Sequence, residues 1–424
     1  MNWQLKIKRR NQNQWLVLFV FMLPFGFGLL NKVLGIPTTI RYSIDLIWGF
    51  LLLTMLVKPK TIAYISTKGI LKWITVFVIY TFILYVINYQ SVFYYLWGFR
   101  NNFRFYVYFL ACMIYLKHED AETYISWFDK VFWVNVLVAL IQYFMLDIRQ
   151  DFLGGIFGVE KGCNGYLNIF QVIIVTKSLV YYLNKKESLI SCVTKCSMAL
   201  LIAAFAELKF FFVEFGIIIV LVVLLTKFSW KKILIILGGS IGIIIGTEIL
   251  INIFPSLKDV MSLRGLLEIA VSDKGYTSSG DMNRLTVFSM SSELFLKTGT
   301  ERLFGLGLGN CDYSEAFGFL MTPFYRKYSL IHYTWLSTAY IFLELGVVGI
   351  IFYFGFFALV FVEAHRKEKS GYVDIEYCQL AKIIALMCIA IAFYNSTLRT
   401  EAAYMIYFVL AIPFWAEKTM VSEK

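Results

Sequence analysis

Histidine, the side chain best suited to acid–base chemistry near neutral pH, is rare in this sequence. Of three copies, His118 and His365 fall in short basic segments, whereas His332 directly follows the long polar segment Pro255–Ile331. An imidazole can accept a proton from a hydroxyl group and so act as a general base. A single histidine at the start of a helix is also common as a structural residue, so the sequence leaves both roles open for His332.

Basic residues accompany His332 at the ends of the neighbouring apolar runs and within the polar segment. They include Arg104, Lys209, Arg284, Arg302 and Arg399. Acidic residues also enter the outer parts of the runs, at Asp45, Glu214, Glu248 and Glu401. Charges inside an apolar span are costly and tend to face a partner or a cavity. Two interpretations stay open: ion pairs within a bundle, or a basic, outward-open cavity for an anionic substrate, since guanidinium binds phosphate oxygens bidentately.

Two other motifs have simpler explanations than catalysis. If a helix starts at His332, Glu344 lies about 18 Å deeper, so we expect a buried hydrogen-bonded partner for a neighbouring helix rather than a catalytic acid. The run Gly305-Leu306-Gly307-Leu308-Gly309 lacks the βαβ context of a dinucleotide site, and a tight backbone turn is sufficient. No cluster of histidine, cysteine and carboxylate has metal-ligand spacing, so neither a metal nor another cofactor is expected.

The helices that position these residues can be predicted from the hydropathy of the sequence. Of 424 residues, 59% are apolar and 16% are charged, against roughly 45–50% and 25% in soluble domains. Repeated apolar runs have the length of membrane-crossing helices. We therefore predict an all-α, polytopic membrane protein with about twelve transmembrane helices, near residues 15–31, 42–57, 70–88, 102–116, 130–147, 166–183, 189–206, 210–226, 232–254, 332–361, 378–394 and 398–415.

The distribution of lysine and arginine predicts the orientation of the chain in the membrane. Lysine and arginine cluster at the N-terminus and in alternate loops, which places that side and both termini in the cytoplasm. The same bias explains the net charge of +11 without a nucleic-acid partner. The predicted regions are an N-terminal transmembrane bundle (1–254), a large extracytoplasmic loop (255–331) and C-terminal transmembrane helices (332–424). The seven scattered cysteines are expected to be buried thiols.

The order of these motifs resembles a known family. Arg284, then Leu303-Phe304-Gly305-Leu306-Gly307, then His332, then Glu344-Leu345-Gly346 is similar to the signature region of the O-antigen polymerase and ligase family. The layout of about twelve spans with one large outward loop agrees. Tyr333 and Lys209 stand where ligases commonly have Asn and Arg, and both departures weaken a ligase assignment more than the family assignment.

The resemblance implies a GT-C-like fold and a metal-independent, inverting glycosyl transfer at the outer face of a bacterial plasma (inner) membrane. The donor would be an oligosaccharide on undecaprenyl pyrophosphate. By the resemblance, Arg284 and Lys209 would hold the pyrophosphate, and His332 would deprotonate the acceptor hydroxyl. Arg399, Arg104 and Arg302 are candidate further phosphate contacts from their placement alone. Membrane lipids, a flippase and a chain-length regulator are the expected partners.

Within this family, a Wzy-type polymerase that joins repeat units of an O-antigen, capsule or exopolysaccharide is the favoured function. A WaaL-type ligase, which passes the finished glycan to another acceptor, uses the same donor and is the nearest alternative. A transporter of lipid-linked oligosaccharides would also be basic and polytopic. Transporters usually contain two similar halves, and no internal repeat is visible in this sequence.

Overall fold

The computed structural model describes residues 12–37, 42–57, 67–227, 229–258 and 282–415, and these residues form α-helices and short 3-10 helices without a β-strand. Residues 1–11, which contain the basic N-terminal cluster, and residues 259–281 of the polar segment lie outside the described part. Six described helices are long and apolar enough to cross a membrane: Lys68–Ile87, His118–Phe144, Asn164–Leu183, Lys231–Ile253, Ser337–Ser370 and Ile375–Tyr394. The chain is therefore all-α, and its composition indicates a membrane protein.

The described part of the first third of the chain forms two short α-helices and four longer apolar α-helices. They are α1 (Gln12–Met22), α2 (Phe27–Leu34), α3 (Ser43–Val57), α5 (Lys68–Ile87), α6 (Val92–Tyr115) and α7 (Ala121–Phe144). The predicted span 15–31 is interrupted between α1 and α2, because Pro24 cannot donate a helical hydrogen bond and Gly26 has φ +85°. Helix α6 begins ten residues earlier than the predicted span 102–116 and therefore also carries Arg100.

Four helices then pack against one another as a group. They are α8 (Asn164–Leu183), α9 (Leu189–Phe205), α10 (Lys209–Leu225) and α11 (Lys231–Ile253). Helices α8 and α11 each contact both α9 and α10. A tight turn joins α9 to α10, as the sequence predicted, with Glu207 in the left-handed region at φ +54°. This turn fixes Lys209 as the first residue of α10.

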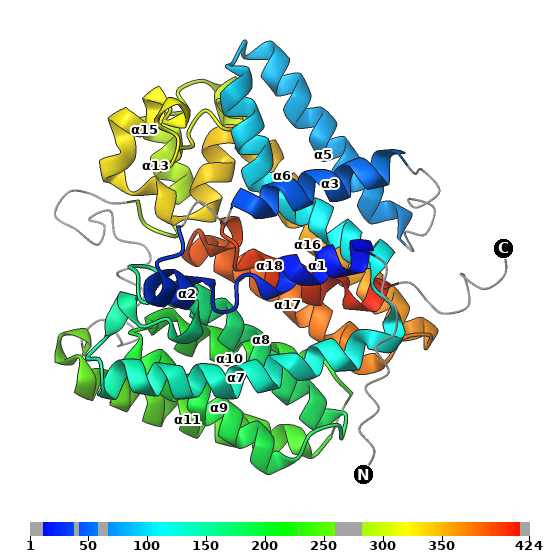
Figure 1. The fold of residues 1–424 in the computed structure, drawn as a ribbon, viewed down its shortest axis with the longest axis vertical. Coiled ribbons are helices and arrows are strands. Elements are labelled where there is room, and N and C mark those ends of the chain that lie inside the picture. Colours follow the sequence, from blue (N-terminus) through cyan, green and yellow to red (C-terminus); the bar gives the residue numbers. More distant parts are fainter. Residues whose placement is uncertain (1–11, 38–41, 58–66, 228, 259–281, 416–424) are drawn as a thin grey trace.

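The C-terminal helices lie between α3, α5 and α6 on one side and α7–α11 on the other (Figure 1). In Figure 1, α16 (Ser337–Ser370), α17 (Ile375–Tyr394) and α18 (Ala403–Ala411) separate α3, α5 and α6 from α7–α11. The contacts of α16 with α5, of α18 with α6, and of α17 with α8 and α10 agree with this arrangement. Aromatic rings fill the centre; Phe356, for example, lies 4.7 Å from Tyr106 and 5.5 Å from Tyr407 between ring centroids.

Two boundaries in this C-terminal region differ from prediction. The predicted helix 332–361 begins only at Ser337, because His332 and residues 333–335 form turns, and α16 is broken at Gly346 (φ +64°, ψ −162°). The predicted span 398–415 begins as helix α18 at Ala403, so Arg399 and Glu401 lie in the connection before it. Both differences occur where charged and turn-forming residues adjoin an apolar run, and there hydropathy does not define the helix end.

The described part of the polar segment, residues 282–331, contains short helices. They are α13 (Val287–Leu294), α14 (Gly299–Phe304) and α15 (Pro323–Tyr328). Helix α14 starts with a capping box, in which Thr298 and Glu301 satisfy each other's backbone N–H groups. A small core, with Val287, Leu296 and Tyr333 fully buried, holds the segment against the start of α16. Figure 1 shows α13 and α15 grouped at one side of the molecule.

Candidate functional site

The ring of Tyr394, the last residue of α17, connects two of the predicted site regions. The guanidinium carbon of Arg284 lies 4.7 Å from the centre of this ring, and Arg284 Nε donates to the Tyr394 carbonyl oxygen at 2.9 Å. Phe210 stacks on the same ring, with 4.3 Å between centroids and 16° between planes. Because Phe210 follows Lys209 directly, the start of α10 and Arg284 meet at Tyr394. We call Phe210, Arg284 and Tyr394 the Tyr394 cluster.

Lys209 is at the surface beside this cluster. Its side chain is 36% exposed, and its Nζ lies 3.1 Å from Glu207 Oε1 in the preceding turn. Such a partly exposed ion pair contributes little to stability. The ammonium group of Lys209 can therefore exchange Glu207 for an incoming anion at small energetic cost.

His332 lies in a turn that backbone hydrogen bonding ties to the segment carrying Arg284. The N–H of Met282, two residues before Arg284, donates to the carbonyl oxygen of Ile331 at 3.1 Å. His332 itself has φ +55°, a left-handed conformation that histidine adopts more readily than most residues. Its half-buried ring stacks on Trp335 with 4.0 Å between centroids. The structure thus brings Lys209, Arg284 and His332 to one end of the bundle.

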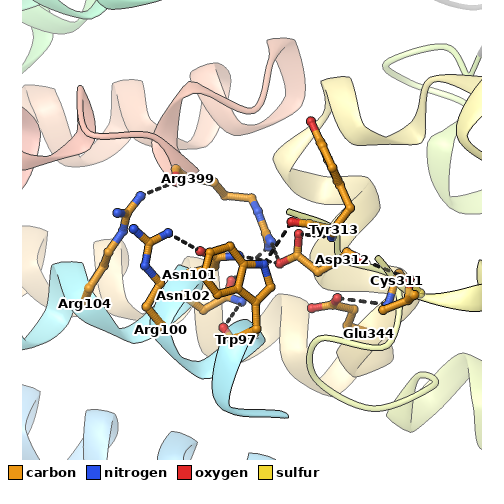
Figure 2. A network of polar contacts seen from close by, with 12 residues as sticks. Trp97, Arg100, Asn101, Asn102, Arg104, Cys311, Asp312, Tyr313, Glu344 and Arg399 are labelled. Atoms are coloured by element: carbon orange, nitrogen blue, oxygen red, sulfur yellow. Dashed lines mark hydrogen bonds and ion pairs between the residues drawn. The ribbon is translucent and has the colours of Figure 1, made fainter. Parts of the chain in front are cut away.

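Arg399 occupies a different, buried position shown in Figure 2. Its Nη2 donates to Asp312 Oδ2 at 2.7 Å, its Nη1 donates to Asn102 Oδ1 at 3.2 Å, and its guanidinium carbon lies 3.8 Å from the centre of the Tyr340 ring. Asn101 Nδ2 donates to the same Asp312 oxygen at 2.7 Å. We call Arg399, Asp312, Asn101 and Asn102 the Arg399 network. With 8% of its side chain exposed, Arg399 is held by protein groups.

Two further ion pairs extend this network along α6. Arg104, whose side chain is 2% exposed, pairs with Glu401 at 3.0 Å and donates from Nη2 to the Arg399 carbonyl oxygen at 2.9 Å. Arg100 binds both carboxylate oxygens of Asp45 at 2.9 Å. Of the two interpretations that the sequence left open, ion pairing within the bundle therefore holds for these arginines. The Arg104 guanidinium supports the backbone of Arg399 from inside the bundle.

Arg302 lies apart from both groups. Its Nε donates to the carbonyl oxygen of Leu296 at 3.0 Å, and its Nη2 lies 3.5 Å from that of Ser292. These contacts close the loop between α13 and α14. Arg302 therefore has a local structural role in this conformation.

The glycine run and Glu344 pack against each other. The break at Gly346 leaves the preceding helical carbonyl groups without their usual donors. Other groups replace these donors: Leu306 N–H donates to the Leu343 carbonyl and Gly307 N–H to the Glu344 carbonyl, each at 2.8 Å, and the Tyr80 hydroxyl donates to the Leu345 carbonyl at 2.7 Å. A Cβ atom on Gly346 would lie 2.4 Å from the Leu303 carbonyl carbon.

Glu344 differs from the expectation of a partner on a neighbouring helix. Its Oε1 accepts from the backbone N–H of Cys311 in the loop, at 3.2 Å. Because α16 starts at Ser337, Glu344 is the eighth residue of the helix, about 10 Å along it from Ser337. The depth expected from a helix that starts at His332 therefore does not apply. Figure 2 shows its side chain directed toward the loop that carries Asp312.

Ionisation in this loop argues against a thiol nucleophile. Burial, reinforced by the charges of Glu344 and Asp312, raises the pKa of Cys311 well above its usual value. Burial also raises the pKa of Tyr313 to about 12. Both groups are therefore protonated at neutral pH, and thiolate chemistry is not supported. All seven cysteines are free and buried, which confirms the prediction made for them.

Asp312, Asn101, Asn102 and Tyr394 were not predicted as site residues. Asp312 meets Asn101 across 211 residues and Arg399 across 87 residues of sequence, so no local spacing reveals these contacts. Tyr394 was placed only as the last residue of the predicted span 378–394. A weak signal existed, because Asn101 and Asn102 interrupt an otherwise aromatic and apolar run.

The two groups can do different things chemically. Lys209 and Arg284 present positive charge beside aromatic rings, and His332 provides a base at the same end of the bundle, whereas the Arg399 network is a paired, buried support. In the described part of the chain, no group of three or more His, Cys, Asp or Glu residues is placed to hold a metal ion. No protein-family model and no curated protein matches this chain.

Proposed function

We propose that this protein polymerises lipid-linked oligosaccharide repeat units into a surface polysaccharide (an O-antigen, a capsule or an exopolysaccharide). The observation that carries the proposal is that the start of α10, which carries Lys209, and Arg284 meet at Tyr394. His332 follows Ile331, whose carbonyl oxygen accepts from Met282 in the segment that carries Arg284. Fixed positive charge can stabilise a departing pyrophosphate, and a base can accept the proton of an attacking hydroxyl, so these groups suit glycosyl transfer.

In the proposed reaction, the acceptor hydroxyl attacks the anomeric carbon of a saccharide on undecaprenyl pyrophosphate. A new glycosidic bond forms with inversion, and the bond to the pyrophosphate oxygen breaks. His332 takes the proton of the attacking hydroxyl. Arg284 and Lys209 stabilise the negative charge that develops on the departing pyrophosphate. No metal ion or other cofactor takes part.

The proposed membrane arrangement is a GT-C-like bundle of about twelve spans in the inner (plasma) membrane of a bacterium. Both termini face the cytoplasm, and the Tyr394 cluster faces outward, where a flippase delivers the donor and a chain-length regulator controls its use. The six described helices of spanning length and the shorter apolar helices, such as Ser43–Val57 and Leu189–Phe205, support this arrangement.

The test is polymer length in cells that carry His332→Ala or Arg284→Ala. Loss of a general base or of a charge-stabilising group typically lowers the rate by about 10²–10³, so the ladder of polymer lengths should collapse to single repeat units in both variants. Protein levels in membranes must be matched. Arg326→Ala is the control, because Arg326 is an exposed arginine of the same polar segment and should leave the ladder unchanged.

The other outcomes distinguish the alternatives. Long chains that accumulate on the lipid carrier in both variants would assign the protein as a ligase, because polymerisation would then proceed without it. A ladder of normal length in both variants, on the lipid carrier and on the final acceptor, would overturn the site assignment.

A further inference from the structure

A second site lies at the opposite end of α16 from His332. There, a cavity of about 540 Å³ opens between the end of α10, the last turns of α16 and the start of α17. Its lining combines apolar and charged residues: Leu224, Leu225, Thr226, Lys227, Phe361, His365, Glu368, Lys369, Ile375 and Lys382. Neither the proposed reaction nor the Arg399 network uses any of these residues.

The single carboxylate in this cavity is already neutralised. Glu368 forms an ion pair with Lys382, whose side chain is only 2% exposed. The same carboxylate accepts from Gln379 Nε2 at 3.3 Å and lies 3.5 Å from His365 Nδ1. These contacts satisfy Glu368 from inside the bundle, so its charge does not repel an anion that enters from the open side.

Two cations remain at the mouth of the cavity. Lys227 and Lys369 are exposed, and neither has an ion-pair or hydrogen-bond partner among the residues that the structure describes. They come from different elements, since Lys227 follows α10 and Lys369 lies in the last turn of α16. Two lysines that line one cavity from different elements can bind a single phosphate group, because each ammonium group has three donors.

The apolar residues that line the cavity indicate which kind of phosphate compound it binds. Leu224, Leu225, Phe361 and Ile375 flank the charged residues, and Leu224 is 71% exposed beside the opening. A free phosphate ion would leave this surface in contact with water. A phosphate that carries acyl chains would cover it, and basic pockets between helix ends at a membrane surface bind anionic headgroups. We propose that this cavity binds the phosphate headgroup of an anionic membrane phospholipid, with Lys227 and Lys369 as its ligands.

The test compares lipid binding to the purified full-length protein by native mass spectrometry. Phosphatidylglycerol and phosphatidylcholine with identical acyl chains are added separately at equal concentrations. Each lysine near the headgroup is worth roughly a fivefold gain in affinity, so the wild type should prefer phosphatidylglycerol on the order of 20-fold. The double variant Lys227→Gln/Lys369→Gln should lose this preference, and Lys227→Arg/Lys369→Arg should keep it.

The matched control is Lys117→Gln/Lys130→Gln, because both lysines are exposed and do not line the cavity. It should bind phosphatidylglycerol as the wild type does. Equal binding of both lipids by the wild type, or an unchanged preference in the Lys227→Gln/Lys369→Gln variant, would overturn the proposal. Displacement of phosphatidylglycerol by an equal concentration of inorganic phosphate or glycerol 3-phosphate would show that the site recognises a soluble anion instead.

Discussion

Around Arg399 and around Tyr394, cationic side chains lie at the same end of the bundle but in different surroundings. Arg399 and Arg104 are 8% and 2% exposed, and each is paired with a carboxylate. Arg284 is half-buried, and Lys209 is 36% exposed. In the first region the charges fix the positions of α6, the loop after α14 and the connection before α18, and in the second they lie next to aromatic rings at the surface.

The buried, paired cations therefore stabilise the fold, whereas the partly exposed cations can take part in binding and chemistry. A buried cation with a carboxylate partner costs several kcal/mol to disturb, whereas a partly exposed cation can change partners cheaply. The Arg399 network also lies only five residues from Tyr394, and the Asn395 carbonyl oxygen accepts from both the backbone N–H (3.2 Å) and the hydroxyl (2.9 Å) of Ser337. Ser337 at the start of α16 therefore fixes the backbone directly after Tyr394, in the short connection that leads to Arg399.

The largest effect on stability is expected from Asp312→Ala. This change leaves the guanidinium of Arg399 buried without its carboxylate, which typically costs about 3–5 kcal/mol. Thermal unfolding of the purified protein in detergent should show a strongly lowered midpoint. Arg284→Ala, on the surface side of the comparison, should cost no more than about 1 kcal/mol. Equal losses from the two variants would remove the distinction between the regions.

A second prediction compares the two regions by the pH dependence of the protein's stability. Burial alone would raise the pKa of Glu401, but Arg104 and Arg100 outweigh burial and lower this pKa from 4.5 to about 2. Because the folded pKa lies below the unfolded value, the stabilisation is fully present above about pH 5 and is lost as the pH falls from 4.5 toward 2. It corresponds to about 3 kcal/mol.

The measurement is the unfolding midpoint between pH 7 and pH 3. Glu401→Gln should lower the midpoint at pH 7 and flatten its fall below pH 5 relative to the wild type. Glu207→Gln is the control from the surface side, because Glu207 pairs with the partly exposed Lys209. A curve for Glu401→Gln parallel to that of the wild type would show that this carboxylate does not contribute through ionisation.

Gly346→Ala tests the connection between α16 and the glycine loop. Alanine would have to adopt φ +64° and place its Cβ 2.4 Å from the Leu303 carbonyl carbon. A strained backbone of this kind costs about 1–3 kcal/mol before the contact is relieved. Gly299→Ala is the control, since nothing lies within 4 Å of a Cβ there. An unfolding midpoint of Gly346→Ala equal to that of Gly299→Ala would contradict the packing described.

The sequence was sufficient for several long helices and insufficient for the breaks within helices and for the contacts between them. Long apolar runs predict α5, α8 and α11 because hydropathy and length together determine a spanning helix. The break at Gly346 depends on donors from Leu306, Gly307 and Tyr80. Because a break in an apolar run leaves no trace in hydropathy, 332–361 reads as one span.

Of the five cations predicted for the site, Arg104, Arg302 and Arg399 make structural contacts with other protein groups, and the residues that support the site were not predicted. His332 stands out because the chain has only three histidines, whereas Arg284 is one of several basic residues of the polar segment and was singled out by its place in the order of motifs. Asp312 and Tyr394 resemble ordinary loop residues until the fold places them beside Arg399 and Arg284. The roles of Lys209, Arg284 and His332 in glycosyl transfer stay predictions until the polymer assay is done.

The smallest effect on polymer formation is expected from a change to the ring of Tyr394. It tests the comparison between the two regions directly, because only an aromatic ring of the surface region is altered. Tyr394→Leu removes the surface on which Arg284 and Phe210 lie but keeps the backbone carbonyl that accepts from Arg284 Nε. A cation–π contact of this kind is worth about 0.5–2 kcal/mol, so the rate of polymer formation should fall about tenfold. Tyr394→Phe retains the ring and should retain the rate. Equal activity of the Leu and Phe variants would mean that the ring does not position Arg284, and that the hydrogen bond from Arg284 Nε to the Tyr394 carbonyl oxygen is sufficient.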